Sequence, residues 1–540
     1  MKLAACAVFF AACASAPRGP GKLRFANAEP VMKVNDSQPI EKPKHVELGL
    51  VTYYLGEDFI EPAVRSLEVG ETKPAANVNS LGEVPDSSWF TNRSPTPEEI
   101  RKGPGLGGPS RDKKWQVTGV KVGGAAIGIL MKDGRGDTYV LKFDERHYAE
   151  TETSADVVVQ RLTWALGYNV PDNEVVTFKR EDLELAPDAA IKDRAGGKKA
   201  MKEADLDKYL AMVEHDGDTY RGLASKFITG DIVGGISPEG TLPDDPNDRV
   251  PHELRRDLRG QRLLWAWVNH PDIKTQNSLA TYDGDHVKWY MLDFGESLGV
   301  GARTTNLARL GYRQEYEVRD MGLSLLSFGL YVHPWERRTK FPPFKGLGWF
   351  DAESFDPGGW AANHNWHPGD VADRADELWA AEKILKLTPK HIAAAVDAGQ
   401  YSDVRTREYL TKTLVARQEK IGRYAFSRIA PLVELKASQR GSQIEVCFSD
   451  LWLRYHYGSP ENTRYRATSF DTTGARLGAT APVSARGDST CISGISTGAT
   501  DAGYTIVRID ASRGRHALPP LYVHAARGPD GYRVIGLDRR

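Results

Sequence analysis

The sequence predicts an α+β protein that ends in a separate antiparallel β-sandwich domain. Between residues 115 and 143, runs of β-branched and aromatic residues alternate with turns rich in Gly and Asp, which is typical of strands. Between residues 373 and 429, apolar residues recur at helical spacing. From residue 432 to residue 540 the apolar period changes to two, which predicts short antiparallel strands, one of them at residues 451–456, packed as a sandwich.

Composition narrows the class of protein. With 540 residues, the chain is long enough for about two to four domains. Charged residues make up 26% of the chain but almost cancel, leaving a net charge of −1, so we expect no nucleic-acid partner. No apolar run approaches the length of a membrane-spanning helix.

The first β-rich segment is predicted to hold three strands, at residues 115–122, 127–131 and 138–143. A turn containing Gly123 and Gly124 separates the first two strands, and the third ends near Lys142. A helix is predicted from about residue 150 to residue 166, closed by Gly167 as its C-cap. The charged segment between Lys179 and Asp218 is predicted to be a partly helical insertion.

Most of the candidate catalytic and metal-binding side chains lie between residues 270 and 295. His270, Asp272 and Asn277 match the protein-kinase catalytic loop, H-R-D-L-x-x-x-N, at its His, Asp and Asn. Lys274 stands two residues after the Asp, where protein kinases often carry a phosphate-facing lysine. Asp293 then opens a D-F-G triplet at a kinase-like distance. The alternative interpretation is an Asp-rich loop whose residues serve only as caps and turns.

The resemblance implies a separate role in phosphoryl transfer for each of these residues. Asp272 would orient the acceptor hydroxyl, and Lys274 would offset charge on the moving phosphoryl group. Asn277 and Asp293 would hold Mg²⁺ against the phosphates of ATP. His270 is expected to be a structural hydrogen-bonding residue beneath the loop, not a proton carrier.

A hairpin is predicted between the two metal-binding positions. Short strands at residues 279–282 and 287–292 flank the turn at residues 283–285. Such a hairpin would bring Asn277 and Asp293 side by side over one ion.

Lys142 resembles the lysine of the V-A-I-K strand, which grips the α- and β-phosphates of ATP in protein kinases. Gly123 and Gly124 stand where a kinase places its glycine-rich loop, but their spacing does not fit G-x-G-x-x-G. Both glycines are therefore candidates for nucleotide binding on position alone.

A kinase-like site also needs an acid on the following helix to orient the lysine. Asp156 is preferred, because related kinase-like families place this acid about eleven residues before the helix-ending Gly, which is Gly167 here. Glu152 and Glu150 remain alternatives. The relatives carry Glu where this chain has Asp156, and the shorter side chain predicts a looser or water-bridged pair with Lys142.

The resemblance extends beyond single motifs. Residues 115–299 resemble the HipA- and CotH-like branch of the protein-kinase-like superfamily, which implies a bilobal fold with ATP between the lobes. Residues 77–431 resemble more closely a bacterial family without an assigned activity, through landmarks at residues 83–93, 141–144, 164–171, 269–272 and 292–295. The acceptor, whether protein, glycan or small molecule, is not implied.

The N-terminus predicts export. A short apolar stretch after Met1-Lys2 ends in Phe10-Ala11-Ala12-Cys13, which resembles a bacterial lipobox with a lipidated Cys13. This places the protein in the cell envelope, anchored to a membrane by lipid. The alternatives are an uncleaved apolar start or a misplaced start codon, which would leave a cytoplasmic protein. In an oxidising compartment Cys447 and Cys491 are candidates for one disulfide.

The predicted domains follow from these boundaries. They are a signal peptide (residues 1–13), a tether with an N-terminal extension (14–114), a kinase-like N-lobe (115–230), a helical C-lobe (231–431) and the β-sandwich domain (432–540). The predicted function is an ATP- and Mg²⁺-dependent phosphotransferase. The alternatives are nucleotidyl transfer on the same fold, or a non-catalytic envelope lipoprotein that acts as a binding module.

Overall fold

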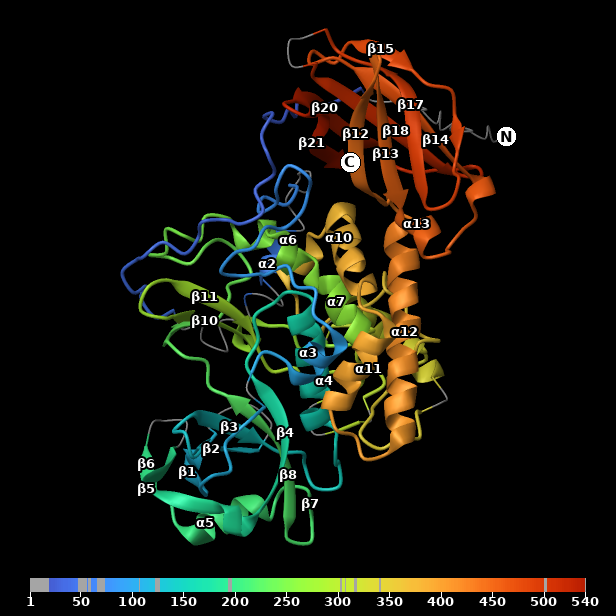
Figure 1. Cartoon of the computed structure of the whole chain (residues 1–540). Coiled ribbons are helices and arrows are strands. Elements are labelled where there is room, and N and C mark those ends of the chain that lie inside the picture. The colour runs from blue at the N-terminus through green and yellow to red at the C-terminus, as the bar shows by residue number, and fades with distance from the viewer. Residues whose placement is uncertain are drawn as a thin grey trace, which may run out of the picture. The chain divides into compact units, whose positions relative to one another are not determined.

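The computed structural model describes residues 19–46, 56, 60–65, 73–105, 107–121, 127–192, 197–301, 304–305, 307–314, 318–338, 341–499 and 503–539. The predicted lipidation site at Cys13 and the turn at Gly123 and Gly124 lie outside these residues. The fold is mixed α+β with several sheets (Figure 1). The chain divides into two compact units. The larger unit comprises Val31–Asn79 and Glu83–Ser427, and the C-terminal unit comprises Met1–Pro30, Ser80–Gly82 and Arg428–Arg540.

An eight-stranded sheet forms one part of the larger unit, with strand order β4-β8-β3-β2-β1-β5-β6 and β7 paired to β8. The three strands predicted at its start are confirmed within two residues. In the register of β2 and β3, Gly128 lies opposite Lys142. The strands are β1 Trp115–Val120, β2 Gly128–Lys132, β3 Thr138–Lys142, β4 Asn173–Lys179, β5 Leu183–Lys192, β6 Lys198–Ala200, β7 His215–Asp216 and β8 Thr219–Lys226.

Within the segment predicted to be a partly helical insertion, residues 183–192 and 198–200 form two strands that the sequence did not predict. Strand β5 joins the sheet parallel to β1, and β6 extends the sheet beyond it. Gly119 of β1 permits the close approach, because a Cβ there would lie 2.6 Å from the Ala190 carbonyl oxygen. The helix predicted from Glu203 is confirmed but ends sooner, as α5 Glu203–Leu210.

The larger unit also contains helices before and after the sheet strands. Residues 252–268 do not form one helix: a 3-10 turn at His252–Leu254 is followed by α6 and, after a break, by α7. At the break, Gly260 lets the ring of Trp379 approach, because a Cβ would lie 2.7 Å from that ring. The helices are α2 Glu61–Arg65, α3 Pro97–Lys102, α4 Glu152–Ala165, α6 Arg256–Arg259, α7 Gln261–Val268, α8 Val318–Leu326, α9 His367–Asp370, α10 Arg374–Leu385, α11 Pro389–Ala398 and α12 Val404–Phe426.

Trp89 and Phe90 anchor the N-terminal extension to the larger unit. The ring of Trp89 stacks on Trp289 with centroids 3.8 Å apart. Phe90 is fully buried and contacts Tyr168 edge-on. Gly167 accommodates Phe90, since its φ is +121° and a Cβ would lie 2.4 Å from the Phe90 ring. Both aromatic residues are therefore buried in a core.

The C-terminal unit contains two antiparallel sheets, one with strand order β12-β13-β17 and one with order β15-β14-β18-β20-β21. Buried residues from both sheets share one apolar cluster. Cys447 and Cys491 lie opposite each other on β13 and β17 and form a disulfide. The strands are β12 Leu432–Arg440, β13 Gln443–Asp450, β14 Thr463–Phe470, β15 Arg476–Ala479, β16 Val483–Ser484, β17 Ser489–Ser496, β18 Thr505–Arg513, β19 His516–Ala517, β20 Leu521–Gly528 and β21 Gly531–Arg539.

One element of this unit was predicted wrongly. Residues 451–456 alternate apolar and polar side chains as a strand does, but they begin with the helical turn α13 Leu451–Arg454. The carboxylate of Asp450 accepts a hydrogen bond from the Trp452 amide at 3.0 Å, so a helix N-cap decides the local structure.

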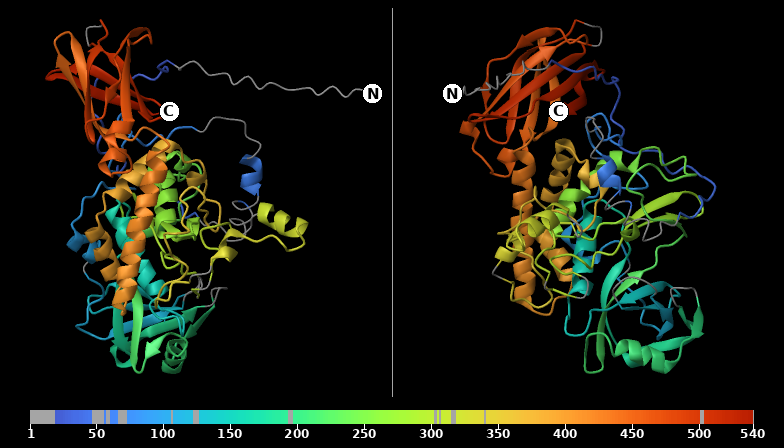
Figure 2. Two further views of the ribbon diagram at one scale, coloured as in Figure 1. Left: turned by 90° about the vertical axis from the view of Figure 1, so that its right-hand side faces the viewer. Right: turned by 180° about the vertical axis from the view of Figure 1, so that it is seen from behind.

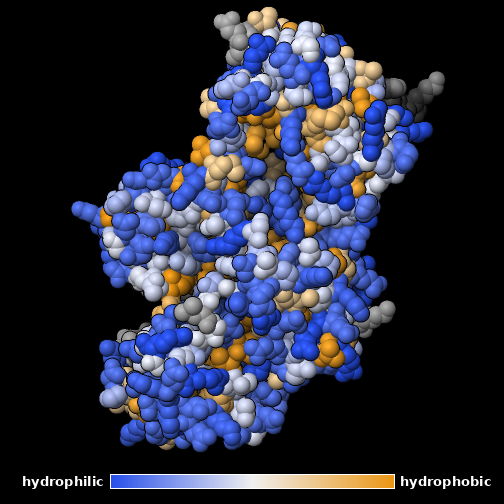
Figure 3. Space-filling model, in the orientation of Figure 1, coloured by the Kyte–Doolittle hydropathy of each residue, from blue (hydrophilic) through white to orange (hydrophobic). Residues whose placement is uncertain are grey.

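Figure 3 shows the hydropathy of the residues on one face of the molecule. Hydrophilic residues predominate there, and apolar residues occur singly or in small groups. Within the described residues, no helix is both long enough and apolar enough to cross a membrane.

Candidate functional site

The loop that carries Asp272 begins where α7 ends. Asn269 has a left-handed backbone (φ 49°), which ends the helix, and its amide oxygen accepts a hydrogen bond from the Trp360 indole at 2.9 Å. His270 is buried beneath the loop, where its Nδ1 lies 2.9 Å from the Ser297 hydroxyl and 3.1 Å from the Glu296 carbonyl oxygen. Burial lowers the pKa of His270, so the ring is neutral and structural, as predicted.

The predicted hairpin is present as β10 Ser278–Tyr282 and β11 Val287–Met291. Ser278 pairs with Met291, and the Leu292 amide donates a hydrogen bond to the Asn277 carbonyl at 2.9 Å. These contacts place Leu292, the residue before Asp293, next to Asn277 at the end of the hairpin. A third strand, β9 Asp231–Gly234, pairs with β10.

Asp272 is held by two other residues of the loop. The Lys274 ammonium donates to both Asp272 carboxylate oxygens at 2.7 Å. The Asn277 amide nitrogen donates to Asp272 Oδ2 at 2.8 Å and to its carbonyl oxygen at 2.7 Å. No hydrogen bond to the Asn277 amide oxygen is found within the described residues, so this oxygen is free to bind a cation.

Lys142 meets two carboxylates at the end of β3. Its Nζ lies 2.8 Å from Asp293 Oδ1 and 3.6 Å from Asp156 Oδ2. Burial alone would lower the pKa of Lys142, but the charges of Asp293 and Asp156 raise it above its ordinary value. The ammonium is therefore charged throughout the physiological range.

Among the candidate acids of α4, Asp156 is the one that reaches Lys142. It is buried, and its Oδ1 accepts a hydrogen bond from the Asn173 amide at 2.6 Å. Burial raises the pKa of Asp156, while the positive charge of Lys142 opposes this. Glu152 lies one turn earlier and adds negative charge near Lys142. Glu150 points elsewhere and pairs with Lys345 at 3.1 Å, so it is not the partner.

Asp293 combines an unusual backbone with an accessible carboxylate. Its φ is 58°, in the left-handed region that Asp tolerates better than most residues. The charge of Lys142 lowers the pKa of Asp293, which keeps the carboxylate ionised. The next residue, Phe294, is buried against Trp265 and His270 and fixes the turn. About half of the Asp293 side chain is exposed to solvent.

Two charged residues near the site were not predicted. Lys121 follows β1, two residues before Gly123 in the sequence; burial lowers its pKa, and the charge of Lys142 lowers it further. Glu296 follows the D-F-G triplet; burial raises its pKa to about 8, and the nearby charge of Asp272 adds to this. The only feature of the sequence that could have indicated Lys121 or Glu296 was its position next to a motif.

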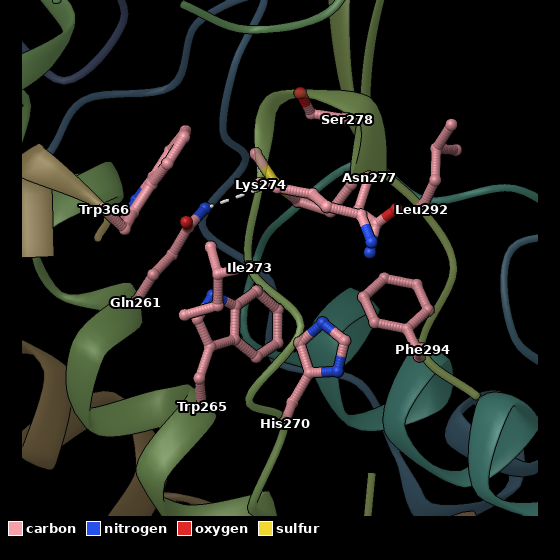
Figure 4. Close-up of a pocket in the computed structure, with 11 residues that line it drawn as sticks. Gln261, Trp265, His270, Ile273, Lys274, Asn277, Ser278, Leu292, Phe294 and Trp366 are labelled. Carbon is pink, nitrogen blue, oxygen red and sulfur yellow. Dashed lines mark hydrogen bonds between the residues drawn. The ribbon is translucent and has the colours of Figure 1, made fainter. Parts of the chain in front are cut away.

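A cavity of about 20 Å³ lies beside the catalytic loop, between Asn277 and Phe294 on one side and Trp265 and Trp366 on the other (Figure 4). This volume admits about one water molecule. The indole N–H groups of Trp265 and Trp366 are buried and make no hydrogen bond within the described residues. The cavity thus suits an ordered water under the loop, not a nucleotide.

Comparison with known proteins gives no family. No protein-family model and no curated protein matches the chain. Similar solved structures include the proinflammatory kinase CtkA of Helicobacter pylori, at 11% identity and a TM-score of 0.30, over 56% of this chain and 92% of that chain. The Golgi casein kinase is similar at 12% identity and a TM-score of 0.23, over 58% and 76% of the two chains.

A second structure of the Golgi casein kinase, with Mn/ADP bound, is similar at 12% identity and a TM-score of 0.23, over 57% of this chain and 74% of that chain. Because these TM-scores are low, we base the function below on the side chains. That the chain belongs to the HipA- and CotH-like branch of the protein-kinase-like superfamily stays a prediction.

Proposed function

We propose that this protein is an ATP- and Mg²⁺-dependent phosphotransferase of the atypical kinase-like class. The observation that carries the proposal is the convergence of Lys142 and Asp293, which are far apart in sequence, beside a loop that presents Asp272, Lys274 and Asn277. A solvated Asp-rich loop would not need a buried lysine from a distant strand, nor an acid on α4 behind that lysine. Positioned carboxylate, amide and lysine groups are what phosphoryl transfer requires.

The donor atoms suit Mg²⁺. The Asn277 amide oxygen and the half-exposed Asp293 carboxylate are hard oxygen ligands, and neither is closed off by a full set of protein hydrogen bonds. Both would hold the ion, which when bound neutralises charge on the phosphates of the nucleotide. The pair is small, as expected for an ion that takes its remaining ligands from phosphate and water.

The protein's own groups have separate roles in the transfer. Lys142 would bind the phosphates, with Asp156 behind it and Lys121 as a second positive charge. The acceptor oxygen forms a bond to the γ-phosphorus while the bond from that phosphorus to ADP breaks. The hydroxyl proton passes to the Asp272 carboxylate, which Asn277 orients by hydrogen bonding. Lys274, now paired with Asp272, would turn to the phosphoryl group as negative charge develops there.

The proposal extends to the layout of the chain. Residues 115–230 and 231–431 would form the two lobes of a kinase-like fold, and residues 432–540 a β-sandwich domain. The Cys447–Cys491 disulfide supports an oxidising compartment, consistent with export and lipidation at Cys13. The acceptor would then be a protein, glycan or small molecule of the cell envelope.

Parallel reactions with γ-labelled and α-labelled ATP test the proposal. We expect label from the γ-phosphate, in the presence of Mg²⁺, on the protein itself or on an envelope fraction. Transfer from the α-phosphate only would replace the proposal with nucleotidyl transfer. If neither label is transferred and Mg²⁺-ATP does not change the melting temperature, the proposal is replaced by the alternative, a non-catalytic lipoprotein that acts as a binding module.

A further inference from the structure

The most exposed apolar surface of the described residues follows α8. Residues 321–332 contain no charged side chain. Six of their side chains are at least half exposed, and we call these residues the apolar ridge: Met321 (60%), Leu325 (78%), Leu326 (79%), Phe328 (95%), Leu330 (82%) and Val332 (50%). Single exposed apolar residues are common on soluble proteins, but six in twelve positions require a binding partner or a lipid.

The backbone turns these side chains outward. After α8 the chain reverses through two consecutive left-handed residues, Phe328 (φ 52°) and Gly329 (φ 80°), and the Gly329 amide donates to the Ser324 carbonyl at 2.8 Å. A left-handed backbone is unfavourable for Phe, and here it leaves the ring almost fully in solvent. In the left view of Figure 2, α8 (yellow) projects from the body as a convex element.

Aromatic rings and guanidinium groups surround the base of the ridge. Trp335 stacks on His333 with centroids 4.3 Å apart, and the Arg313 guanidinium lies 5.1 Å from the Trp335 ring. Neither Arg313 nor the exposed Arg337 forms an ion pair within the part of the chain that the structure describes. Tyr331 packs edge-on against His333. Trp, Tyr and Arg beside an uncharged apolar tip form the pattern of a segment that enters the interface of an anionic membrane.

We propose that the apolar ridge inserts into the surface of an anionic lipid bilayer. A convex tip without charged groups suits a fluid lipid phase, whereas a protein partner would need a groove and paired polar groups at its rim. The guanidinium groups of Arg313 and Arg337 complement anionic headgroups at the depth where the apolar side chains end. The proposal is independent of the phosphotransferase activity, because it uses none of the site residues.

Flotation with lipid vesicles tests the ridge. The full chain carrying Cys13→Ser, which cannot be lipidated, is mixed with vesicles of phosphatidylcholine alone or with added phosphatidylglycerol. We expect flotation that is strongest with phosphatidylglycerol. Leu325→Ser and Phe328→Ser should each lower the partition coefficient roughly tenfold, because each removes one large apolar side chain from the lipid.

The controls separate lipid binding from other effects. Val404→Ser replaces an equally apolar exposed residue of α12, outside the ridge, and should leave flotation unchanged. All three variants should keep the wild-type melting temperature, since the side chains are exposed. The proposal is overturned if the Cys13→Ser chain does not float, or if the ridge variants float as well as Val404→Ser. It is also overturned if sedimentation shows a dimer that Phe328→Ser dissociates, because the ridge would then bind a second copy.

Discussion

Lys142 Nζ contacts the carboxylate of Asp293 at 2.8 Å and that of Asp156 only at 3.6 Å. Lys142 is therefore closer to the predicted metal ligand than to the acid of α4. A nucleotide with its metal would compete for both Lys142 and Asp293, so the lysine must turn from Asp293 toward the phosphates. The short side chain of Asp156 leaves room for this, because it forms an ion pair without a tight hydrogen bond.

The first prediction concerns Asp293→Asn. The change keeps the size of the side chain but removes the charge that binds the metal and pairs with Lys142. We expect the wild-type protein to gain about 2.7 kcal/mol of unfolding free energy at 100 times the Kd of Mg²⁺-ATP. The variant should gain almost nothing. Melting curves with and without EDTA provide the measurement, and Asp283→Asn, on the far turn of the hairpin, is the matched control. An equal gain in the variant would exclude Asp293 as a ligand.

The second prediction separates nucleotide binding from chemistry. Asp272→Asn should keep the stabilisation by Mg²⁺-ATP but lower transfer of the γ-phosphate by roughly a hundredfold or more, since it removes the proton acceptor. Lys142→Met should weaken both, because it removes a phosphate contact and leaves Asp156 and Asp293 without their cation. Thermal shifts and label transfer on the same preparations give the comparison. If Asp272→Asn abolishes nucleotide binding instead, the residue serves the metal and not the acceptor.

The sequence predicted the site better than it predicted the fold around it. Asp272, Lys274, Asn277 and Asp293 lie within a short stretch, so their spacing encodes their geometry once the hairpin is recognised. Lys142 was found because a strand ending in lysine before a helix is also a local pattern. Lys121 and Glu296 stand next to motifs in the sequence, but they were not predicted, because their interactions with Lys142 and Asp272 arise from packing between segments that are distant in sequence.

The errors in secondary structure have local causes. Strand β5 was missed because it contains Pro187 and because its buried residues, Leu183, Ala186 and Ala189, recur every three positions instead of two. The turn at α13 was interpreted as a strand because its apolar residues alternate, while the cap by Asp450 favours a helix. In β5, pairing with β1 decides the structure against the local pattern, and in α13 one capping residue does.

The third prediction uses the carboxyl of Glu296, whose pKa burial raises to about 8 from an ordinary value of 4.5. Between these two pH values the folded state keeps a proton that the unfolded state has released, so the unfolding free energy should fall as pH rises. The amide introduced by Glu296→Gln does not titrate between these two pH values. The variant should therefore be more stable than the wild-type protein by roughly 1–3 kcal/mol at pH 8. The difference should vanish near pH 4.5.

Denaturant unfolding of the nucleotide-free protein in EDTA, across this pH range, measures the effect. Glu184→Gln, an exposed substitution on β5, is the control and should follow the wild-type curve. Asp272, Lys274, Glu152 and Asp293 also act on Glu296, so the measurement is repeated in Asp272→Asn, where the pH dependence should become smaller. The prediction would be contradicted if the difference in unfolding free energy between the wild-type protein and Glu296→Gln did not change with pH.

The fourth prediction concerns anchoring. Cys13→Ser should move the protein from the membrane fraction to the soluble fraction after a high-salt wash, because a diacylglyceryl group is lost and the ridge alone binds reversibly. Mass spectrometry of the native N-terminus provides an independent readout, since the processed chain would lack residues 1–12 and begin with lipidated Cys13. A native chain that keeps Met1 and fractionates with the cytosol would defeat the prediction and restore an intracellular kinase as the better interpretation.

The last prediction concerns the disulfide of the C-terminal unit. Cys447 and Cys491 are 44 residues apart, and closing a loop of this length stabilises a fold by about 4 kcal/mol through the entropy of the unfolded chain. The double variant Cys447→Ser, Cys491→Ser should therefore lose roughly 2–4 kcal/mol of unfolding free energy in this unit. The unfolding transition of the larger unit, which is the one that Mg²⁺-ATP should stabilise, should keep its wild-type midpoint, because the proposed site lies wholly in that unit. Non-reducing peptide mapping should recover the two cysteines joined in protein isolated from the envelope. Two free thiols there, with stability unaffected by reductant, would remove both the bond and the support it gives to an oxidising compartment.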